Sequence, residues 1–520
     1  MFNIKPIEQV IQNRVKKISI QFKIAFTSCI IVGLLAHLYM FMNKFPNYDD
    51  MAINSFGASL KLGRWFLWVL GAIAYHLDFV YSIPWINGFL TVICIATAAG
   101  MLVDMLHVKS KLCCALIGAC LVVFPSWTAT FFFMFTAPYY GVAFLLAVCS
   151  VYIAMKYYGK SKIKWLSPVC LACSLGIYQA YLPFVATCYV TVLLFEILLL
   201  EQNWIKSLKK AFYYLIQLLA GGGIYFLVMK ISLQITGQSL TSYKGVDKMG
   251  VLSKESLLYF WRVIEQDFLG ISINNNLEIS HNLLLKVMYL LLSIFTILCI
   301  VVSIAKSIKR HNYMEAVFEV IYTIALVITI NSIYLICQDG VYSLMRYSYV
   351  WLIIFPICLL DGMEMTLAER GKFMILLGWG MTLSICAGIF SYVHLANAEY
   401  FSMQLTFEQA KSYYTTVITQ IKELDGYEPN MPVSFVGYGD IVDESLYRNQ
   451  IMKVFEISGR DQVLAQTYDM GAFLRYYCGF DVEFFDIDTM QYKEISDMPT
   501  YPSEGSVQII DGNVVVKFSE

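Results

Sequence analysis

The chain has 520 residues, of which 58% are hydrophobic and 14% are charged, and its formal net charge is −1. A soluble globular chain is typically about 45–50% apolar and about 25% charged, so this composition excludes an ordinary soluble protein and predicts a polytopic α-helical protein of the lipid bilayer. The small net charge neither favours nor excludes a nucleic-acid partner, but no basic stripe indicates one, and we expect none.

Apolar segments of spanning length follow one another along the chain. A transmembrane helix needs about 20 mostly apolar residues, and about eleven segments meet this criterion. They form a membrane domain over residues 19–399, preceded by a cytoplasmic amphipathic N-terminus at residues 1–18. The first is interpreted as an uncleaved anchor, because no small-residue cleavage site follows a short apolar region. The segments are residues 19–42, 84–106, 112–130, 137–155, 165–181, 183–201, 211–233, 281–304, 316–337, 345–361 and 373–395.

The apolar stretch 64–80 is ambiguous, because it carries Arg64, His76 and Asp78. Lys and Arg gather in short cytoplasmic loops, and this rule separates the two alternatives. If the stretch does not span, all basic segments fall on one side; if it spans, the first falls opposite the others. We therefore expect an amphipathic helix in the membrane interface and a cytoplasmic N-terminus. The basic segments are Lys5/Arg14/Lys16/Lys17, Lys109/Lys111, Lys156/Lys160/Lys162/Lys164, Lys206/Lys209/Lys210, Lys306/Lys309/Arg310 and Arg370/Lys372.

Three long segments are then placed on the outer side: the first outer loop at residues 43–83, a second loop at 236–280, and the tail. The tail, residues 400–520, changes in character. Its stretch "FEQAKSYYTTVITQIKEL" predicts a helix, and "MPVSFVGYG" and "DVEFFDI" predict short strands. The stretch "GSVQIIDGNVVVKF" predicts a hairpin with its turn at Asp511-Gly512. We expect a small extracytoplasmic α/β domain with an accessory or acceptor-recognising role.

The cysteines indicate neither a disulfide framework nor a metal site. Of the 14 Cys, all lie in apolar runs except Cys478, and no CxxC pair has a His at metal-binding spacing. Such cysteines are expected to behave as small buried hydrophobes. No cofactor is predicted; the sequence does not exclude a divalent metal but gives no support for one.

Two adjacent carboxylates, Asp49 and Asp50, lie in the first outer loop close to a membrane surface. Asp50 precedes "MAINSFGASL" and is a favoured residue for capping a helix N-terminus. Alternatively, one of the two is a general base at the outer membrane surface, because an ionisable residue at that depth is functional by default. Neighbouring residues do not face each other on a helix or strand, so one carboxylate would act while the other caps.

Other polar residues near the outer ends of spans are candidates for binding an anionic substrate. Arg64, in "LGRW", either snorkels to lipid head groups or clamps a phosphate by bidentate hydrogen bonds. The same two alternatives apply to Lys230 and Arg346, which together with Arg64 would line a site for a lipid phosphate. Tyr178 and Gln179 lie at an outer turn, "GIYQAYLP". Tyr is common in interfacial belts, whereas an amide at that depth needs partners.

These segments resemble, in order, the bacterial Gtr family of membrane glucosyltransferases, type II. The resemblance is carried by Asp49-Asp50, "GASLKLGRW", "SLGIYQAYLPF", "LMRYSYVW" and "ANAEYFSMQLTFEQAKSYYTTVITQI", and it extends over most of the chain. No single motif is specific, but the ordered set is. The resemblance implies a GT-C-like architecture in the bacterial inner membrane and an active site at its outer face. It implies transfer of a sugar, expected to be glucose, from a polyprenyl-phosphate carrier to a cell-surface polysaccharide such as O-antigen.

The resemblance also implies roles for individual residues. Asp50, with Asp49 as second choice, matches the acidic position of the family and is expected to be the general base. Arg64 matches the Gly-Arg that follows, and Tyr178-Gln179 matches the Tyr-Gln pair, as substrate-binding residues. The acidic element is not Asp-x-Asp, which gives less support to a metal-bound pyrophosphate donor. Two alternatives stay open: a polysaccharide or lipid exporter, and a non-catalytic membrane protein of envelope assembly.

Overall fold

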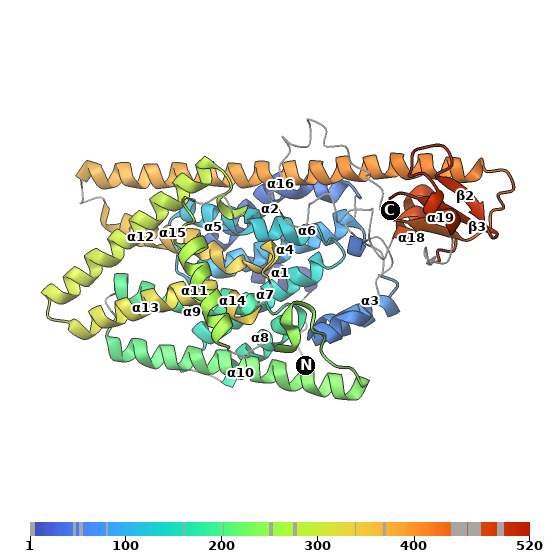
Figure 1. Cartoon of the computed structure of the whole chain (residues 1–520). Helices are drawn as coiled ribbons and strands as arrows, with labels where there is room; N and C mark the ends of the chain where they lie inside the picture. Colours follow the sequence, from blue (N-terminus) through green and yellow to red (C-terminus); the bar gives the residue numbers. More distant parts are fainter. Residues whose placement is uncertain are drawn as a thin grey trace.

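The computed structural model is mostly helical, with a small three-stranded sheet near the C-terminus (Figure 1). It describes residues 6–44, 48–50, 56–79, 82–159, 162–200, 202–248, 253–273, 278–337, 340–367, 371–437, 455, 470–485 and 493–519.

Eight helices in the described part of the chain are long and apolar enough to cross a membrane. A ninth span is counted if α5 (Lys111–Val123) and α6 (Pro125–Phe131), which meet at a 41° bend, form one broken segment. Pro125 explains the bend, because proline cannot donate a backbone hydrogen bond to the preceding turn. The eight are α2 (Ile20–Met42), α4 (Pro84–Met105), α7 (Ala137–Lys156), α9 (Tyr181–Leu200), α10 (Trp204–Thr236), α12 (Leu283–Lys309), α13 (Tyr313–Asn331) and α16 (Gly371–Lys422).

The protein is therefore a polytopic membrane protein, whereas the count of eleven spans stays a prediction. Two of the expected spans, 165–181 and 345–361, correspond to the shorter helices α8 (Leu166–Ile177) and α15 (Trp351–Leu367). With a rise of 1.5 Å per residue, α8 is only about 18 Å long, less than the roughly 30 Å of a hydrocarbon core.

The remaining helices are short and connect or flank the long ones. The α-helices are α1 (Ile7–Val15), α3 (Trp65–His76), α11 (Lys254–Val263), α14 (Ile333–Ile336), α18 (Met470–Cys478) and α19 (Lys493–Asp497). The 3₁₀ turns are η1 (Tyr48–Asp50), η2 (Gly57–Leu62), η3 (Lys162–Trp165), η4 (Tyr243–Lys248), η6 (Glu278–Ser280), η7 (Ser343–Met345) and η8 (Tyr347–Val350), and η5 (Ile264–Phe268) is a π-helix.

Helix α3 covers most of the ambiguous stretch 64–80. Its twelve residues correspond to about 18 Å, which is too short to cross a bilayer. The expected amphipathic pattern is absent from it, because its exposed side chains include the apolar Ile73 and Tyr75 while Leu67 and Gly71 face the interior. An apolar outer face suits contact with lipid better than contact with water.

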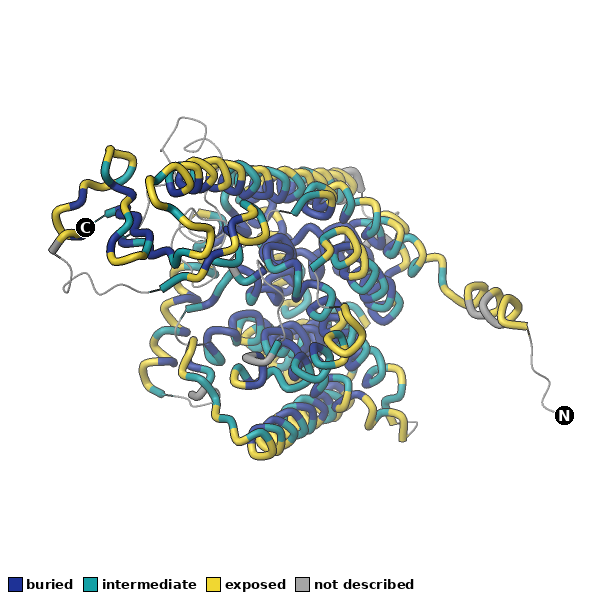
Figure 2. The backbone as a smooth tube through the Cα atoms, turned by 90° about the vertical axis from the view of Figure 1, so that its right-hand side faces the viewer, coloured by how far each residue is buried: buried dark blue, intermediate teal, exposed yellow. Residues whose placement is uncertain are grey.

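The centre of the membrane domain is formed by α2, α4, α5 and α7, which pack against one another. Close approach is needed where α2 meets α5, since a Cβ atom on Gly118 would lie 2.3 Å from the carbonyl oxygen of Ala25. Small residues permit such contacts between membrane helices. Figure 2 shows buried positions at the centre and exposed ones along the outer helices; many of the exposed side chains are apolar, such as Leu219 and Leu298.

One buried carboxylate has a clear structural role. Asp361 in α15 is 5% exposed and accepts hydrogen bonds from the backbone N–H of Lys109, at 3.0 and 3.1 Å, and of Ser110, at 2.6 Å. These N–H groups lie just before α5, whose N-cap is Ser110; the Ser110 hydroxyl accepts from the backbone N–H of Cys113. Asp361 therefore ties the start of α5 to α15.

Helix α16 joins the membrane domain to the C-terminal part without a break. Its 52 residues correspond to about 78 Å, and Figure 1 shows it extending past the other helices to the sheet. The boundary expected between residues 399 and 400 thus falls inside one continuous helix. Near that point Tyr400 donates or accepts a 2.8 Å hydrogen bond with His37 of α2, and Gln404 is bonded to Tyr39.

The C-terminal sheet contains β1 (Val433–Val436), β2 (Val507–Ile510) and β3 (Asn513–Lys517), in the order β1-β3-β2. The hairpin expected at Asp511-Gly512 is confirmed: β2 and β3 are antiparallel, and both turn residues have positive φ angles, 49° and 77°, as a two-residue type I′ turn requires. The strand expected in "DVEFFDI" is reduced, in its described part, to a bridge between Phe484 and Val433.

Helix α3 and the C-terminal sheet lie at the same end of the molecule in Figure 1. The C-terminal end of α10 reaches the same region, where the backbone N–H of Thr241 donates to the carbonyl of Lys61 at 3.0 Å. The first outer loop, which carries the candidates Asp49, Asp50 and Arg64, thus lies at the same end of the molecule as the C-terminal sheet.

Candidate functional site

The carboxylate of Asp50 lies in a small group that we call the Asp50 cluster: Lys44, Asp50 and Ser82. Asp50 ends the short turn η1 and is only 4% exposed. Its Oδ2 atom lies 3.1 Å from Lys44 Nζ and accepts a 3.2 Å hydrogen bond from the Ser82 hydroxyl. Its Oδ1 atom is buried and has no hydrogen-bond partner among the described residues. Oδ2 is therefore engaged by two side-chain donors, whereas Oδ1 has none among the described residues.

Burial controls the protonation of this group. Loss of solvation raises the pKa of Asp50, the charge and hydrogen bond of Lys44 and the hydroxyl of Ser82 lower it, and the neighbouring charge of Asp49 raises it slightly. The net effect is a raised pKa. A carboxylate with a raised pKa is a stronger base than a solvated one, which suits it to take a proton from a hydroxyl.

The C-terminal part contributes Tyr477, which the sequence did not single out. Burial raises the pKa of Tyr477, and the charge of Asp50 raises it further, so the end of α18 lies near the carboxylate. Tyr477 also contacts Phe407 of α16, with ring centroids 5.2 Å apart. Helices α16 and α18 therefore bring the C-terminal part to the Asp50 cluster.

The capping role considered for Asp50 concerns residues 51–55, which lie outside the described residues. The next described helix is η2, and its N-cap is Phe56, which makes no capping hydrogen bond with its side chain. Asp49 is half-buried beside Asp50. Asp50 forms the ion pair with Lys44.

A second group, the Arg64 cluster, contains Arg64, Tyr140, Tyr178, Gln179 and Tyr225. The Arg64 Nη1 atom donates to the Tyr140 hydroxyl at 3.0 Å. Its guanidinium also lies 5.3 Å from the centre of the Tyr178 ring, which stacks on Tyr140 at 4.3 Å. Cation–π contact of this kind stabilises an arginine that is partly removed from water.

Gln179 and Tyr225 hold the backbone that precedes Arg64. The Gln179 amide donates to the carbonyl of Leu62 at 2.8 Å, and the Tyr225 hydroxyl donates to the carbonyl of Gly63 at 3.1 Å. Gly63 has a positive φ of 73°, and a Cβ atom there would lie 2.8 Å from the Tyr225 oxygen. Only glycine fits this turn. Gln179 and Tyr225 thus hold the turn that positions Arg64.

Two polar atoms of the Arg64 cluster are buried without a hydrogen-bond partner among the described residues. They are the Nε atom of Arg64, a donor, and the hydroxyl of Tyr178. Buried polar groups are normally satisfied, and exceptions gather where a ligand completes the site. An anionic oxygen placed here would satisfy both.

The other two predicted cations lie elsewhere. Arg346 is 8% exposed, and its Nη1 donates to both oxygens of Glu278, at 3.0 and 2.8 Å. Its Nε donates to the hydroxyl of Tyr334 and its Nη2 to the carbonyl of Val341. The snorkelling considered for Arg346 is thus replaced by a buried ion pair, and its guanidinium is already occupied by protein acceptors.

Lys230 lies on the exposed side of α10, whereas Tyr225 and Met229 of the same helix are buried. No contact among the described residues brings Lys230 to Arg64. Of the five predicted substrate-binding residues, the structure brings together Arg64, Tyr178 and Gln179, and it leaves Lys230 and Arg346 apart from them.

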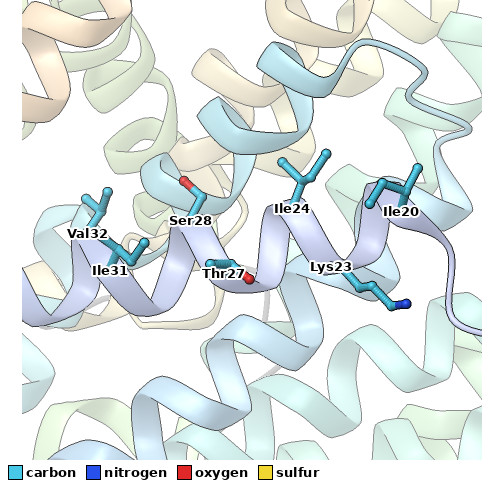
Figure 3. A pocket seen from close by; sticks show the side chains of 7 residues that line it. All are labelled: Ile20, Lys23, Ile24, Thr27, Ser28, Ile31 and Val32. Atoms are coloured by element: carbon cyan, nitrogen blue, oxygen red, sulfur yellow. The ribbon is translucent and has the colours of Figure 1, made fainter. Parts of the chain in front are cut away.

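Two cavities lie away from both clusters. The larger, about 500 Å³, runs along α2, and Figure 3 shows its lining side chains arrayed on that single helix, from Ile20 to Val32. The smaller, about 340 Å³, lies between the ends of α4, α7, α9 and the start of α10. Neither is lined by a sequence-predicted site residue.

Several residues of the two clusters escaped the sequence analysis. Lys44 is six positions from Asp50, and its charge in the same loop was a usable signal. Ser82, Tyr140 and Tyr225 carry no such signal, because each reaches its partner only through the packing of separate segments.

A family model described as glucosyl transferase GtrII matches residues 38–357, which is more than half of the chain. The matched range contains every residue of the two clusters, whereas Tyr477 lies beyond it. No curated protein and no solved structure matches the chain.

Proposed function

Because the chain belongs to the glucosyl transferase GtrII family, and is thus a membrane glucosyltransferase, we propose that it moves glucose from a polyprenyl-phosphate carrier to a cell-surface polysaccharide. The single observation that carries the proposal is the Asp50 carboxylate, which is buried and ion-paired through Oδ2 but has an open Oδ1. A carboxylate so held can take one proton during each turnover.

Asp50 acts as the general base. The hydroxyl oxygen of the acceptor attacks C1 of the glucosyl group, its proton passes to Oδ1 of Asp50, and the bond between C1 and the phosphate oxygen breaks. The phosphate leaves on the carrier with the bonding electrons. A well-placed general base typically contributes a rate factor of about 10²–10⁴. Lys44 keeps Asp50 ionised between turnovers, and Asp49 is the second candidate for the base.

Arg64 stabilises the charge that develops on the departing phosphate. Its Nε atom and the Tyr178 hydroxyl are the open polar groups of the Arg64 cluster, and an arginine donates two parallel hydrogen bonds to a phosphate. Fixed donors aimed at developing charge are an effective form of catalysis. Gln179 keeps Arg64 in place through the turn at Gly63.

The reaction takes place at the outer face of the bacterial inner membrane. The basic loops predict a cytoplasmic side away from the first outer loop, and nucleotide sugars do not reach the other face. A lipid carrier supplies the activated sugar there. The C-terminal part, which approaches Asp50 through Tyr477, contributes to binding of the acceptor.

The test is transfer by the purified protein in lipid nanodiscs. Labelled polyprenyl-phosphate glucose and UDP-glucose are offered in parallel, each with a candidate surface polysaccharide. We expect label to reach the polysaccharide from the lipid-linked donor alone. Transfer from UDP-glucose would contradict the donor assignment, and transport of polysaccharide without transfer would favour an exporter.

A further inference from the structure

The smaller cavity, of about 340 Å³, lies far from the Asp50 cluster. It is formed by the C-terminal ends of α4, α7 and α9 and the N-terminal part of α10, whereas Ser82 of the Asp50 cluster precedes the N-terminus of α4. Helix α4 has 22 residues, about 33 Å, so the cavity and the cluster lie at opposite ends of the membrane domain.

The cavity carries opposite charges in equal number. Lys210 is ion-paired with Glu196, Lys156 donates to the Tyr152 hydroxyl at 3.0 Å, and Asp104 accepts a 2.5 Å hydrogen bond from Ser19. Two cations and two carboxylates therefore line it. Such a lining does not favour a purely anionic ligand; it favours one that carries a negative and a positive group.

Two polar atoms in the lining lack a hydrogen-bond partner among the described residues. One is the hydroxyl of Tyr214, a residue that is 2% exposed, and the other is Oε2 of Glu196. The Tyr214 ring is fixed by stacking on Tyr189, with centroids 4.4 Å apart. A carboxylate oxygen and a fixed hydroxyl that lack hydrogen-bond partners in the same cavity favour a ligand with N–H donors.

Apolar side chains complete the lining. Phe195, Leu200 and Met155 lie beside the charged residues, so the cavity accepts a polar group that is attached to an apolar one. Its position at the ends of membrane-spanning helices is the depth at which lipid head groups lie.

We infer that this cavity binds the head group of a zwitterionic phospholipid with a primary ammonium, of the phosphatidylethanolamine type. The phosphate faces Lys156, and the ammonium donates to Glu196 Oε2 and the Tyr214 hydroxyl. The site is separate from the transfer reaction and is expected to hold its lipid in the absence of donor or acceptor.

The test is retention of lipid by the full-length protein, measured by native mass spectrometry. The protein is released from nanodiscs of phosphatidylethanolamine or of phosphatidylcholine, whose trimethylated ammonium keeps the charge but has no N–H donor. We expect retention of phosphatidylethanolamine to exceed that of phosphatidylcholine by roughly threefold to tenfold, the effect of about one hydrogen bond. Equal retention of the two lipids would overturn the inference.

A matched pair of variants tests whether the Tyr214 hydroxyl contributes to the preference for phosphatidylethanolamine. Tyr214→Phe removes only the hydroxyl and should reduce the preference for phosphatidylethanolamine, because Glu196 Oε2 still accepts from the ammonium. Tyr213→Phe is the control, because the Tyr213 hydroxyl donates to the carbonyl of Ala154 and Tyr213 does not line the cavity. Equal effects of the two variants would place the lipid elsewhere.

Soluble phosphoethanolamine should compete poorly with the lipid for the cavity. Retention of soluble phosphoethanolamine as strong as that of the lipid would overturn the assignment to a membrane lipid.

Discussion

Two ion pairs with a buried carboxylate, Lys44–Asp50 and Arg346–Glu278, are both built from segments between spanning helices, but they differ in which carboxylate oxygens have hydrogen-bond partners. Glu278 accepts from Arg346 through both oxygens, and the other guanidinium nitrogens bond to Tyr334 and Val341. Asp50 accepts through Oδ2 alone. A saturated pair links two segments of the fold, whereas a half-satisfied carboxylate retains an oxygen for chemistry.

A third buried carboxylate, Asp361, has a structural role like that of Glu278. It accepts three backbone hydrogen bonds from residues just ahead of α5 and so holds the start of that helix. From the sequence alone, Asp50, Asp361 and Arg346 are equivalent charged residues close to apolar segments. Their partners, not their residue types, separate structural roles from chemical ones.

The largest effect, on the free energy of unfolding, is expected from breaking the Arg346–Glu278 ion pair. Arg346→Ala leaves Glu278 buried without its partner, and removal of one member of a buried pair typically costs about 3–5 kcal/mol of unfolding free energy. Unfolding by denaturant in detergent measures this loss. The double variant Arg346→Ala/Glu278→Ala should recover part of it, because no unpaired charge remains. A stable Arg346→Ala protein with weakened donor binding would instead assign Arg346 to the donor site.

The next effect concerns the donor phosphate. Arg64→Ala removes the open Nε donor, and charge-assisted hydrogen bonds are worth about 1.5–3 kcal/mol, so kcat/KM for polyprenyl-phosphate glucose should fall roughly tenfold to a hundredfold. Arg64→Lys should recover little, because lysine lacks the planar fork. Lys230→Ala is the matched control on the exposed side of α10 and should leave kcat/KM unchanged. A kcat/KM that falls in Lys230→Ala and not in Arg64→Ala would contradict the assignment.

A smaller effect is expected on the pH dependence of kcat/KM when Lys44 is replaced. Asp50 must be ionised to accept a proton, so activity is lost as the pH falls through its pKa. Lys44 lowers that pKa, and Lys44→Gln should therefore move the acidic limb of the kcat/KM profile to higher pH. An unchanged limb would show that Asp50 does not govern it.

The smallest effect is expected for Ser82→Ala. The Ser82 hydroxyl also lowers the pKa of Asp50, but it ranks below Lys44. The acidic limb should shift in the same direction as in Lys44→Gln and by less. The pH–rate profiles of both variants, recorded side by side, show which substitution shifts the acidic limb more. A larger shift for Ser82→Ala than for Lys44→Gln would contradict the expected order.

Much of the fold was predictable because it depends on local signals. The Asp511-Gly512 turn and the apolar segments that became α2 and α4 follow from residue type and spacing. The unbroken α16 was also predictable, since no Gly or Pro separates residues 389 and 425. The short lengths of α8 and α15 depend on packing against neighbours, which composition does not encode.

The candidate site was only partly predictable. Arg64 and Gln179 were identified by polarity at apolar depth, and the structure joins them through the turn at Gly63. The pairing of Arg346 with Glu278 joins positions 68 residues apart, and no local pattern indicates it. The same holds for Ser82 and Tyr477, which approach Asp50 only in the folded chain.

The central claim, that Asp50 is the general base, is tested most directly by the turnover of Asp50→Asn with labelled polyprenyl-phosphate glucose. Asn keeps the size and most hydrogen bonds of Asp but cannot take the proton, so turnover should fall by about 10²-fold or more, with normal membrane insertion. Asp49→Asn, measured in parallel, should keep most activity. Near-normal turnover in Asp50→Asn would contradict the claim and move the search for the base to Asp49 or, if both variants are active, to Asp267 beside Arg346.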